Sequence, residues 1–452
     1  MRLDWRILVY ILHMKVMKFG GTSVGSPQRI KDVASLVTAT AGDFVVLSAM
    51  SGTTNSLVEI SDYLYNKNPE GAMDTIGRLE AKYRSHISEL YSKEEYKGKA
   101  QAYADGVFEY LKSFTKSLFT QTEEKLIVAQ GELLSTHMMY YYLLEMGYKP
   151  ALLNALDFMK TDAQGEPDSE YIRARLTEVL KGVEGADLYL TQGFICRNLH
   201  GEVDNLLRGG SDYTASLIGA ALGVEEIQIW TDIDGMHNND PRVVEGTSAV
   251  RHLHFDEAAE LGYFGAKILH PTCIQPARFA NIPVRLLNTM DPQAPGTIIN
   301  NIKECGSIKA IAAKDNITAI RIKSSRMLLA HGFLRKVFEI FESYQTSIDM
   351  VCTSEVGVSM SIDNTLHLNE IVHDLKKYGT VSVDLDMCIV CVVGDMDWEN
   401  VGFESRAMEA MKDIPVRMIS YGGSNNNISV LVRGEDKNRT LRSLSKCLFE
   451  NA

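Results

Sequence analysis

Two hydrophobic periods alternate along the first part of the chain. Lys15–Phe19 and residues 43–49 are short apolar runs typical of buried strands, and residues 27–38 between them carry apolar side chains at helical spacing. This order predicts a βαβ unit at the start of a mainly parallel sheet. Residues 57–120 then show helical spacing throughout, which predicts an all-helical insertion.

The alternation of strand and helix continues to about residue 300. A long helix is predicted over residues 122–146, and further strands are predicted at 151–156, 187–192, 227–231 and 284–287. Residues 14–300 are therefore expected to form one α/β domain, a three-layer sandwich with helices on both faces of the sheet.

From residue 308 the pattern changes to short strands with two helices, and it then repeats. The first copy predicts strands at 317–322, 347–353 and 357–362 and helices at 333–344 and 366–377. The second copy predicts strands at 387–394, 416–421 and 427–431 and helices at 400–411 and 438–448. Such a repeat is typical of α+β modules of the βαββαβ kind, with expected limits of 306–378 and 379–452.

The composition is that of a globular protein with about three domains. Of 452 residues 45% are hydrophobic, and 46 Lys and Arg against 58 Asp and Glu give a formal charge of −12. This charge provides no general attraction to nucleic acid or anionic membranes. Seven scattered cysteines fit reduced thiols, and the apolar run at residues 7–12 is too short to span a membrane, so a cytoplasmic protein is expected. Residues 1–13 are taken as an N-terminal extension outside the fold.

Two groups of metal-binding residue types are better explained without a metal. Cys388 and Cys391 have CxxC spacing, but they lie in an apolar run that predicts a buried strand, and no second ligand pair accompanies them. The cluster of His, Asp and Glu at residues 252–257 fits a solvated helix start. No metal held by protein side chains alone is predicted.

The first predicted strand leads into a turn whose chemistry suits phosphate. Residues 18–23 read Lys-Phe-Gly-Gly-Thr-Ser. Paired glycines let backbone N–H groups approach an anion closely, Thr22 and Ser23 add hydroxyl donors, and Lys18 adds a positive charge. The lysine precedes the glycines, unlike in the Walker pattern, so another phosphate-binding fold is required. A purely structural turn is the alternative for this segment taken alone.

Four later segments occur in the order found in the amino-acid kinase family. They are residues 46–55 (VLSAMSGTTN), 208–215 (RGGSDYTA), 230–242 (WTD at its start, DPR at its end) and 264–271 (FGAKILHP). Together with residues 18–23 they resemble the aspartokinases of that family, from Met14 into the C-terminal repeat, which looks like two ACT modules. The resemblance implies a carbamate kinase-like sandwich followed by two ferredoxin-like ACT modules, the second including a strand from about 308–313.

The resemblance also implies an activity and a set of site residues. The activity is ATP-dependent phosphorylation of the L-aspartate side-chain carboxylate to 4-phospho-L-aspartate, the first step of lysine, threonine and methionine biosynthesis. ATP would be the co-substrate, with Mg²⁺ carried mainly by the nucleotide. The implied catalytic residues are Lys18, Asp212 and Lys267. The implied substrate-binding residues are Thr54, Glu132, Arg208, Gly209, Gly210 and Ser211. The implied ATP-binding residues are Lys18, Phe19, Gly20, Gly21, Thr22, Ser23, Thr231, Asp232, His237, Arg242, Lys267 and Ile268.

Two of these segments depart from the usual pattern of the family. His237 stands where many relatives have tyrosine, and Leu207 replaces the glycine usually found before Arg208. The contact of residue 237 with the base or ribose is therefore left open. By resemblance, Arg208 would bind a substrate carboxylate as a planar fork and Glu132 would meet the substrate ammonium. On its position alone, Glu132 could equally be an exposed helix glutamate.

The first ACT-like module matches the lysine-contacting pattern of lysine-sensitive aspartokinases. The matching positions are Met327, Gly332, Phe333, Leu334, Ser347, Ile348, Asp349, Thr353, Ser354, Glu355 and Val356. Asp349 and Glu355 supply negative charge suited to a ligand with two ammonium groups, although acidic residues at strand ends are often only solvated. Ala330 stands where many bacterial lysine-sensitive relatives have serine, so inhibition by threonine, or no inhibition, stays open.

Other functions fit the sequence less well. A glutamate or acetylglutamate kinase would share the fold but not this start together with tandem ACT modules. A catalytically decayed amino-acid sensor is disfavoured by the presence of Lys18, Asp212 and Lys267. No Rossmann fingerprint follows the second module, so no fused homoserine dehydrogenase is expected. The segment 421–428 resembles the edge that pairs ACT modules between subunits, which predicts a homodimer or a dimer of dimers; an Asn-rich hairpin turn is the alternative.

Overall fold

The computed structural model describes residues 14–116, 118–183, 185–206, 209–265, 269–324 and 331–450. The predicted N-terminal extension, residues 1–13, lies outside these ranges. The chain divides into two compact units, the first formed by residues 1–236 with 269–301 and the second by 237–268 with 302–452. Residues 237–268 therefore group with the C-terminal part, and the predicted domain limits stay a prediction.

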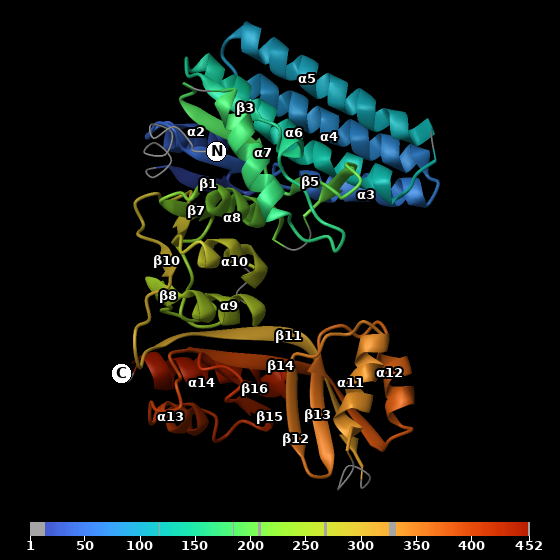
Figure 1. The fold of residues 1–452 in the computed structure, drawn as a ribbon, viewed down its shortest axis with the longest axis vertical. Helices are drawn as coiled ribbons and strands as arrows, with labels where there is room; N and C mark the ends of the chain where they lie inside the picture. Colours follow the sequence, from blue (N-terminus) through green and yellow to red (C-terminus); the bar gives the residue numbers. More distant parts are fainter. Residues whose placement is uncertain are drawn as a thin grey trace. The chain divides into compact units, whose positions relative to one another are not determined.

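The first unit is built on a mainly parallel sheet with the strand order β3-β4-β2-β1-β7-β9-β10 (Figure 1). β1 pairs in parallel with β2 and β7, and the antiparallel pair in this order is β9–β10. The strands are β1 (Lys15–Phe19), β2 (Phe44–Leu47), β3 (Pro150–Leu153), β4 (Leu188–Gln192), β7 (Glu226–Thr231), β9 (Val284–Asn288) and β10 (Thr297–Asn300), with a separate hairpin of β5 (Ile195–Arg197) and β6 (Val203–Asn205). The predicted strands of this part are confirmed.

Helices cover both faces of this sheet, which confirms the predicted three-layer sandwich. α2 (Pro27–Val37) and α6 (Gln121–Glu145) pack on one face, and α8 (Gly210–Leu222) packs on the other beside α7 (Ser169–Lys181) and α10 (Pro271–Phe279). α2 begins where its sequence predicts, because the Ser26 hydroxyl accepts the Arg29 N–H and Pro27 occupies the first turn. The core is continuous from the sheet into the helices.

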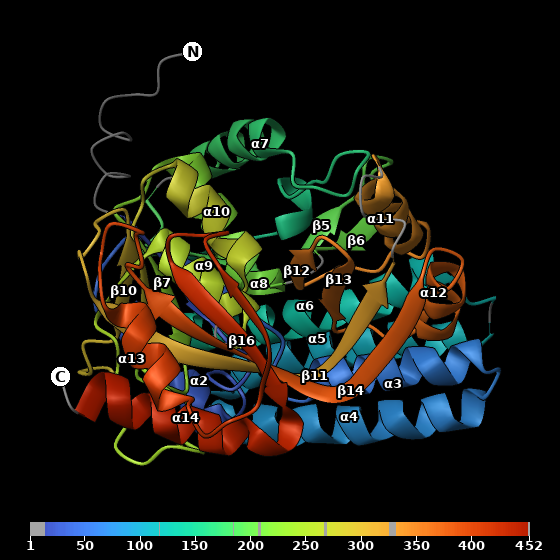
Figure 2. The ribbon, with the colours of Figure 1, turned by 90° about the horizontal axis from the view of Figure 1, so that it is seen from below.

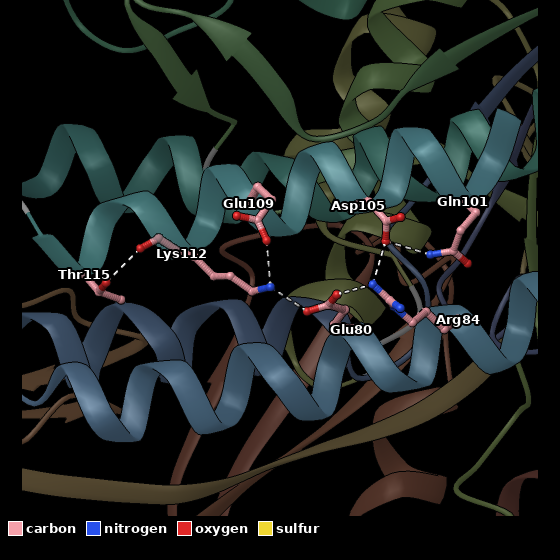
Figure 3. Close-up of polar contacts among 7 residues, drawn as sticks. All are labelled: Glu80, Arg84, Gln101, Asp105, Glu109, Lys112 and Thr115. Carbon is pink, nitrogen blue, oxygen red and sulfur yellow. Dashed lines mark hydrogen bonds and ion pairs between the residues drawn. The ribbon is translucent and has the colours of Figure 1, made fainter. Parts of the chain in front are cut away.

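The helical insertion consists of α3 (Thr53–Tyr65), α4 (Pro69–Leu90) and α5 (Glu94–Ser113); α3 and α5 pack against α6, and α4 packs against α3 and α5. Figure 3 shows the polar seam between α4 and α5. Lys112 Nζ lies 2.9 Å from both Glu80 and Glu109, and Arg84 pairs with Glu80 (2.7 Å) and Asp105 (2.9 Å). Arg84, Asp105 and Glu109 are exposed, while Glu80 and Lys112 are half-buried. Ion pairs with solvated members stabilise little, so the seam sets helix register more than it stabilises the unit.

The second unit contains an antiparallel sheet with the order β12-β13-β11-β14-β16-β15 (Figure 2). Its strands are β11 (Ile308–Lys323), β12 (Met350–Ser354), β13 (Gly357–Ile362), β14 (Thr380–Gly394), β15 (Val416–Tyr421) and β16 (Asn427–Arg433). Its helices are α11 (Phe333–Ser343), α12 (Leu368–Leu375), α13 (Phe403–Ala410) and α14 (Lys437–Ser445), and the preceding part of the unit supplies β8 (His252–His254) and α9 (Phe255–Tyr263).

The prediction of a separate strand at 317–322 is wrong, because β11 runs unbroken through both modules. It pairs with β14 along almost its whole length, with register shifts between Lys314 and Ala319. Asn316 has φ of 60° and Asp386 on β14 has φ of 54°. Both irregularities lie where polar residues interrupt the apolar alternation. Backbone pairing carries the strand across this point, so the two modules share one sheet.

Among the described helices, none combines the length and apolar character needed to cross a membrane.

Candidate active site

The predicted phosphate turn lies at the carboxyl end of β1, in the middle of the parallel sheet. The Gly20 N–H donates to the Trp230 carbonyl (3.3 Å), and Phe19 is fully buried with its ring stacked on Trp230. A Cβ on Gly21 would lie 2.7 Å from the Ala49 carbonyl oxygen, so this position accepts only glycine without a backbone shift. The carboxyl ends of parallel strands are where α/β folds place their ligands.

Ser23 supports the turn from inside the protein. It is 1% exposed, and its hydroxyl shares a 2.7 Å hydrogen bond with the hydroxyl of Thr289. The side chains of Phe19 and Ser23 therefore belong to the packed interior, while Gly21 and Thr22 line the adjoining cavity.

Lys18 forms an ion pair with Asp212 beneath this turn. Lys18 Nζ lies 2.6 Å from Asp212 Oδ1, and the two side chains are 12% and 15% exposed. Asp212 lies in the first turn of α8, where the helix dipole favours a negative charge. The pair fixes the direction of the Lys18 ammonium while leaving both groups near the cavity.

α8 begins at two glycines with positive φ, 82° at Gly209 and 35° at Gly210. A Cβ on Gly209 would lie 1.8 Å from Cys273 Sγ, and a Cβ on Gly210 would lie 2.8 Å from the Phe194 ring. Only glycines let the N-terminus of α8 approach its neighbours this closely. The start of α8 at Gly210 and Ser211 thus lies at the cavity, in a position suited to an anion.

Glu132 is a buried carboxylate on α6 that faces the same space. It is 3% exposed, and its Oε1 accepts the Ala49 N–H at 3.1 Å. Its Oε2 is buried and has no hydrogen-bond partner among the residues that the structure describes. Burial raises the pKa of Glu132 to about 7, although the Ala49 N–H and the Lys18 charge act in the opposite direction. The position of this carboxylate rules out the alternative of an exposed helix glutamate.

These elements enclose one cavity of about 470 Å³. It brings together eight predicted site residues, which are Lys18, Gly21, Thr22, Thr54, Glu132, Gly209, Gly210 and Ser211. Its other lining residues are Ser48, Ala49, Met50, Ser51, Gly52, Asn55 and Phe194. Phe194 was missed, because it lies in none of the segments that carried the resemblance; its position after Gly193, at the carboxyl end of β4, was the available signal.

Comparison with known proteins shows which family the chain resembles in sequence and in structure. The model of the amino acid kinase family matches residues 13–288, and an ACT domain model matches residues 390–448. Lysine-sensitive aspartokinase 3 of Escherichia coli is 31% identical, over 96% of this chain and 99% of its own length. Aspartokinase 2 of Arabidopsis thaliana, a chloroplastic enzyme, is 33% identical, over 96% of this chain and 84% of its own length.

The chain belongs to the amino acid kinase family, as an aspartokinase. A solved structure of E. coli aspartokinase III in complex with aspartate and ADP superposes with a TM-score of 0.84 at 30% identity, covering 97% of this chain and 100% of that one. The structure of that enzyme with lysine and aspartate gives a TM-score of 0.78 at 31% identity, covering 96% and 99%. The predicted fold, with its C-terminal ACT modules, and the predicted aspartate kinase activity are thereby confirmed.

The remaining predicted ATP-binding residues of this aspartokinase fall in three places. Thr231 ends β7 in the first unit and Asp232 follows it, where the Thr231 hydroxyl donates to Asp232 (3.2 Å). His237 and Arg242 belong to the second unit: His237 Nδ1 lies 3.0 Å from the Thr247 hydroxyl, and Arg242 makes a two-pronged contact with Asp240 (3.0 and 2.8 Å). Arg208, Lys267 and Ile268, as well as Leu207, lie outside the described residues.

The predicted effector residues surround the start of α11 and the β12–β13 hairpin. Gly332 has φ of 80° and caps α11, Phe333 is buried, and Leu334 is 37% exposed. Ser347 is exposed and Ile348 half-buried before β12, while Thr353, Ser354, Glu355 and Val356 are exposed at the hairpin turn. Met327, like Ala330, lies outside the described residues.

Asp349 differs from these neighbours because its side chain is only 1% exposed. Its Oδ1 accepts hydrogen bonds from Lys314 Nζ (2.8 Å) and from the Tyr263 hydroxyl (2.9 Å). Burial raises the pKa of Asp349, while the Lys314 ammonium partly offsets this effect. The carboxylate predicted to meet a ligand ammonium is therefore already paired with an ammonium of the protein.

Proposed function

We propose that the cavity between β1, α6 and the N-terminus of α8 is where the γ-phosphoryl group of ATP passes to L-aspartate. An oxygen of the aspartate side-chain carboxylate attacks the γ-phosphorus while the bond to the β–γ bridging oxygen breaks, which yields 4-phospho-L-aspartate and ADP. The reaction needs charge neutralisation and in-line positioning, not a protein nucleophile. The observation that carries the proposal is the shared cavity of Lys18, Glu132 and the α8 N-terminus.

Each described residue of the cavity has a role that suits its chemistry. Lys18, directed by Asp212, neutralises charge on the transferring phosphoryl group, and the N–H groups of the glycine turn donate to its oxygens. The free Oε2 of Glu132 accepts the substrate ammonium. Thr54, Ser211 and the N–H groups that begin α8 bind the substrate carboxylates. By resemblance, Arg208 and Lys267 would add positive charge to the substrate and phosphate sides.

ATP would bring Mg²⁺ bound to its phosphates, and this ion supplies further charge neutralisation there. In the described part of the chain, no group of three or more His, Cys, Asp and Glu side chains could hold a metal ion. The donors at the cavity suit an anionic ligand, as expected for residues that bind metal-loaded phosphates and not the metal alone.

The test is ATP- and Mg²⁺-dependent formation of aspartyl hydroxamate from aspartate and hydroxylamine. The wild-type protein should form product. Lys18→Ala should lose at least about a hundredfold in kcat, because it removes the positive charge that neutralises the transferring phosphoryl group. Lys125→Ala is a matched control, since this lysine pairs with Asp204 on another part of the same unit. Folded wild type that forms no aspartate-dependent product would favour the amino-acid sensor.

We further propose that lysine inhibits this aspartokinase at the first ACT module. The E. coli relative is named lysine-sensitive, and its structure with lysine and aspartate resembles this chain. Asp349 and Glu355 lie at the two ends of β12, where they supply negative charge for a ligand with two ammonium groups. Activity should fall with lysine but not with threonine; inhibition by threonine alone would assign the module to the other amino acid.

Assembly as a homodimer or dimer of dimers, in the cytoplasm, is part of the same proposal. Strand β15 comes last in the strand order of the six-stranded sheet and ends at Tyr421, where the segment 421–428 that resembles the subunit-pairing edge begins. Elution as a monomer at micromolar concentration would contradict it.

A further inference from the structure

A compact group of charged side chains joins three elements of the second unit. Lys314 on β11 lies 2.8 Å from Asp349, just before β12, and 2.9 Å from Asp363, just after β13. The ring of Tyr263, the last residue of α9, lies 4.6 Å from Lys314 Nζ, and its hydroxyl donates to Asp349 at 2.9 Å. Lys314 is thus held by two carboxylates and by an aromatic face.

This group is not electrically balanced. Two carboxylates face one ammonium, so the group carries one net negative charge when all three are ionised. The hydrogen bonds from Lys314 and Tyr263 both fall on Oδ1 of Asp349, while its buried Oδ2 has no hydrogen-bond partner among the residues placed by the structure. An unpaired oxygen on a side chain that is 1% exposed is costly unless a donor arrives. A ligand ammonium would supply both the missing charge and the missing donor.

The same group contacts the segment that follows α9. Gly265 has φ of 120°, and a Cβ there would lie 2.0 Å from the carbonyl oxygen of Ala313, the residue before Lys314. Tyr263 and Gly265 therefore both touch the 313–314 stretch of β11, one through its side chain and one through its backbone. In the sequence, Lys267 comes two residues after Gly265. A movement of Lys314 or Tyr263 would therefore displace Gly265, at the start of this segment.

We infer that Tyr263 and Lys314 are positioning residues that couple occupation of Asp349 to the end of α9 and to Gly265, which follows it. The ligand is an amino acid whose ammonium binds Oδ2 of Asp349. Once that ammonium shares the carboxylate, Oδ1 holds Lys314 and Tyr263 less strongly, and the hydrogen bond that fixes the end of α9 to Asp349 is weakened. The inference rests on the proposed inhibition by lysine and names the route by which it would act.

The experiment separates binding of lysine from its effect on catalysis. Lysine affinity is measured by calorimetry, with and without saturating aspartate and ADP, and the residual kinase activity is measured at saturating lysine. Tyr263→Phe removes only the hydroxyl that bonds to Asp349. Tyr344→Phe is the matched control, because the Tyr344 hydroxyl makes the same kind of bond, 2.9 Å to Asp374, elsewhere in the first module.

We expect Tyr263→Phe to keep lysine affinity within about threefold of wild type. The antagonism, which is the factor by which saturating aspartate and ADP weaken lysine binding, should fall at least about fivefold. Tyr344→Phe should change neither. Lys314→Met, a second variant that removes the shared ammonium, should also weaken the antagonism. Tyr344→Phe should keep the wild-type activity without lysine, since its bond to Asp374 lies outside this route. Tyr263→Phe and Lys314→Met remove a contact that lysine is inferred to weaken, so their activity without lysine should already be lowered toward the lysine-inhibited level.

Three outcomes would overturn the inference. Unchanged antagonism in both Tyr263→Phe and Lys314→Met would show that the contact carries no coupling. Loss of lysine affinity by more than about tenfold in Tyr263→Phe would make Tyr263 part of the binding site instead. Unchanged lysine affinity in Asp349→Asn would place the ammonium elsewhere. A wild-type protein that binds no lysine at all would instead refute the proposed function of the module.

Discussion

Glu132 allows the sharpest test of the active site, because its burial makes opposite predictions for stability and for activity. The change is Glu132→Gln, which keeps the shape and the acceptor for the Ala49 N–H but removes the charge. In the free protein the buried carboxylate opposes folding, whereas in the proposed complex it pairs with the substrate ammonium. The variant should therefore be more stable and less active than the wild type.

The stability effect can be estimated from the pKa. Burial raises the pKa of Glu132 from the ordinary 4.5 to about 7, so the folded state favours the protonated form. The resulting penalty is absent below pH 4.5, grows as pH rises from 4.5 to 7, and is complete above 7. A difference of this size corresponds to about 3 kcal/mol, or roughly 5 to 10 °C in the melting temperature of a unit of this size.

The assay is thermal unfolding of both proteins from pH 5 to pH 8, together with the KM for aspartate over the same range. The stabilisation by Glu132→Gln should be small at pH 5 and reach its full value at pH 8. The wild-type KM should rise about tenfold per unit below pH 7, because the protonated carboxyl cannot pair with an ammonium. In the variant, the KM should be about a hundredfold higher than in wild type at pH 8 and nearly independent of pH.

Two results would refute this reasoning. An equal shift in melting temperature at pH 5 and pH 8 would show that Glu132 does not titrate between these values. An unchanged KM in Glu132→Gln would show that the carboxylate does not bind the substrate. Glu124→Gln is the matched control, since Glu124 lies on the same helix in an exposed contact with Tyr65 and should leave both quantities unchanged.

Three further predictions follow from other contacts. Gly209→Ala should abolish most of the activity and lower the melting temperature, because φ of 82° is strained for alanine and the new Cβ would overlap Cys273 Sγ. Adding Cys273→Ala removes the overlap but not the strain, so calorimetry should show that only part of the melting temperature is restored. Lys82→Met should raise the KM for aspartate about fivefold with little change in kcat, because Lys82 Nζ donates to the Ser51 carbonyl (2.7 Å) at the cavity wall; an equal fall in kcat would contradict this. Lys112→Ala on the α4–α5 seam should cost less than about 1 kcal/mol, and even less at high salt, as unfolding at two ionic strengths would show.

The sequence predicts the catalytic sheet well because its strands are short, apolar and buried on both faces. β1 has the predicted limits, and the predicted glycine turn follows it at the carboxyl end of the sheet. Such strands leave a strong signal, since a polar residue within them is buried and needs a specific partner, as Gln228 of β7 has in Glu226 and Trp230. The turn after β1 comes close to the backbone at Ala49, and this close approach requires glycine at position 21.

The position of Glu132 could not be predicted from periodicity. Residues 127–132 of α6 are all buried, because the helix lies between the sheet and the helical insertion. A helix that is enclosed on all sides has no polar face, so its sequence pattern does not show which side chains point toward the cavity. Only the tertiary packing shows that the carboxylate faces Lys18 and not solvent.

The long strands of the second unit were hidden for a different reason. Lys314, Asp315 and Asn316 interrupt the apolar alternation of β11, which reads as a loop between two strands. In the structure, Lys314 is retained within the strand because its ammonium is bound by Asp349 and Asp363, which come from distant parts of the sequence. A buried charge whose partners are remote leaves no local signal.

The charges of the active-site cavity divide into a paired set and an unpaired one, and this division bears on substrate choice. Lys18 and Asp212 neutralise one another at 2.6 Å, whereas Glu132 Oε2 has no donor among the described residues. A dicarboxylate without an amino group would bury Glu132 further and leave that oxygen unpaired, while an amino dicarboxylate brings the donor with it. If this cavity is the proposed substrate site, it should reject the first ligand more strongly than it attracts the second, because an unpaired buried charge is more unfavourable than a missing contact. In the proposed site, the unfavourable burial of Glu132 in the free protein would thus be the physical basis for the selection of an amino acid.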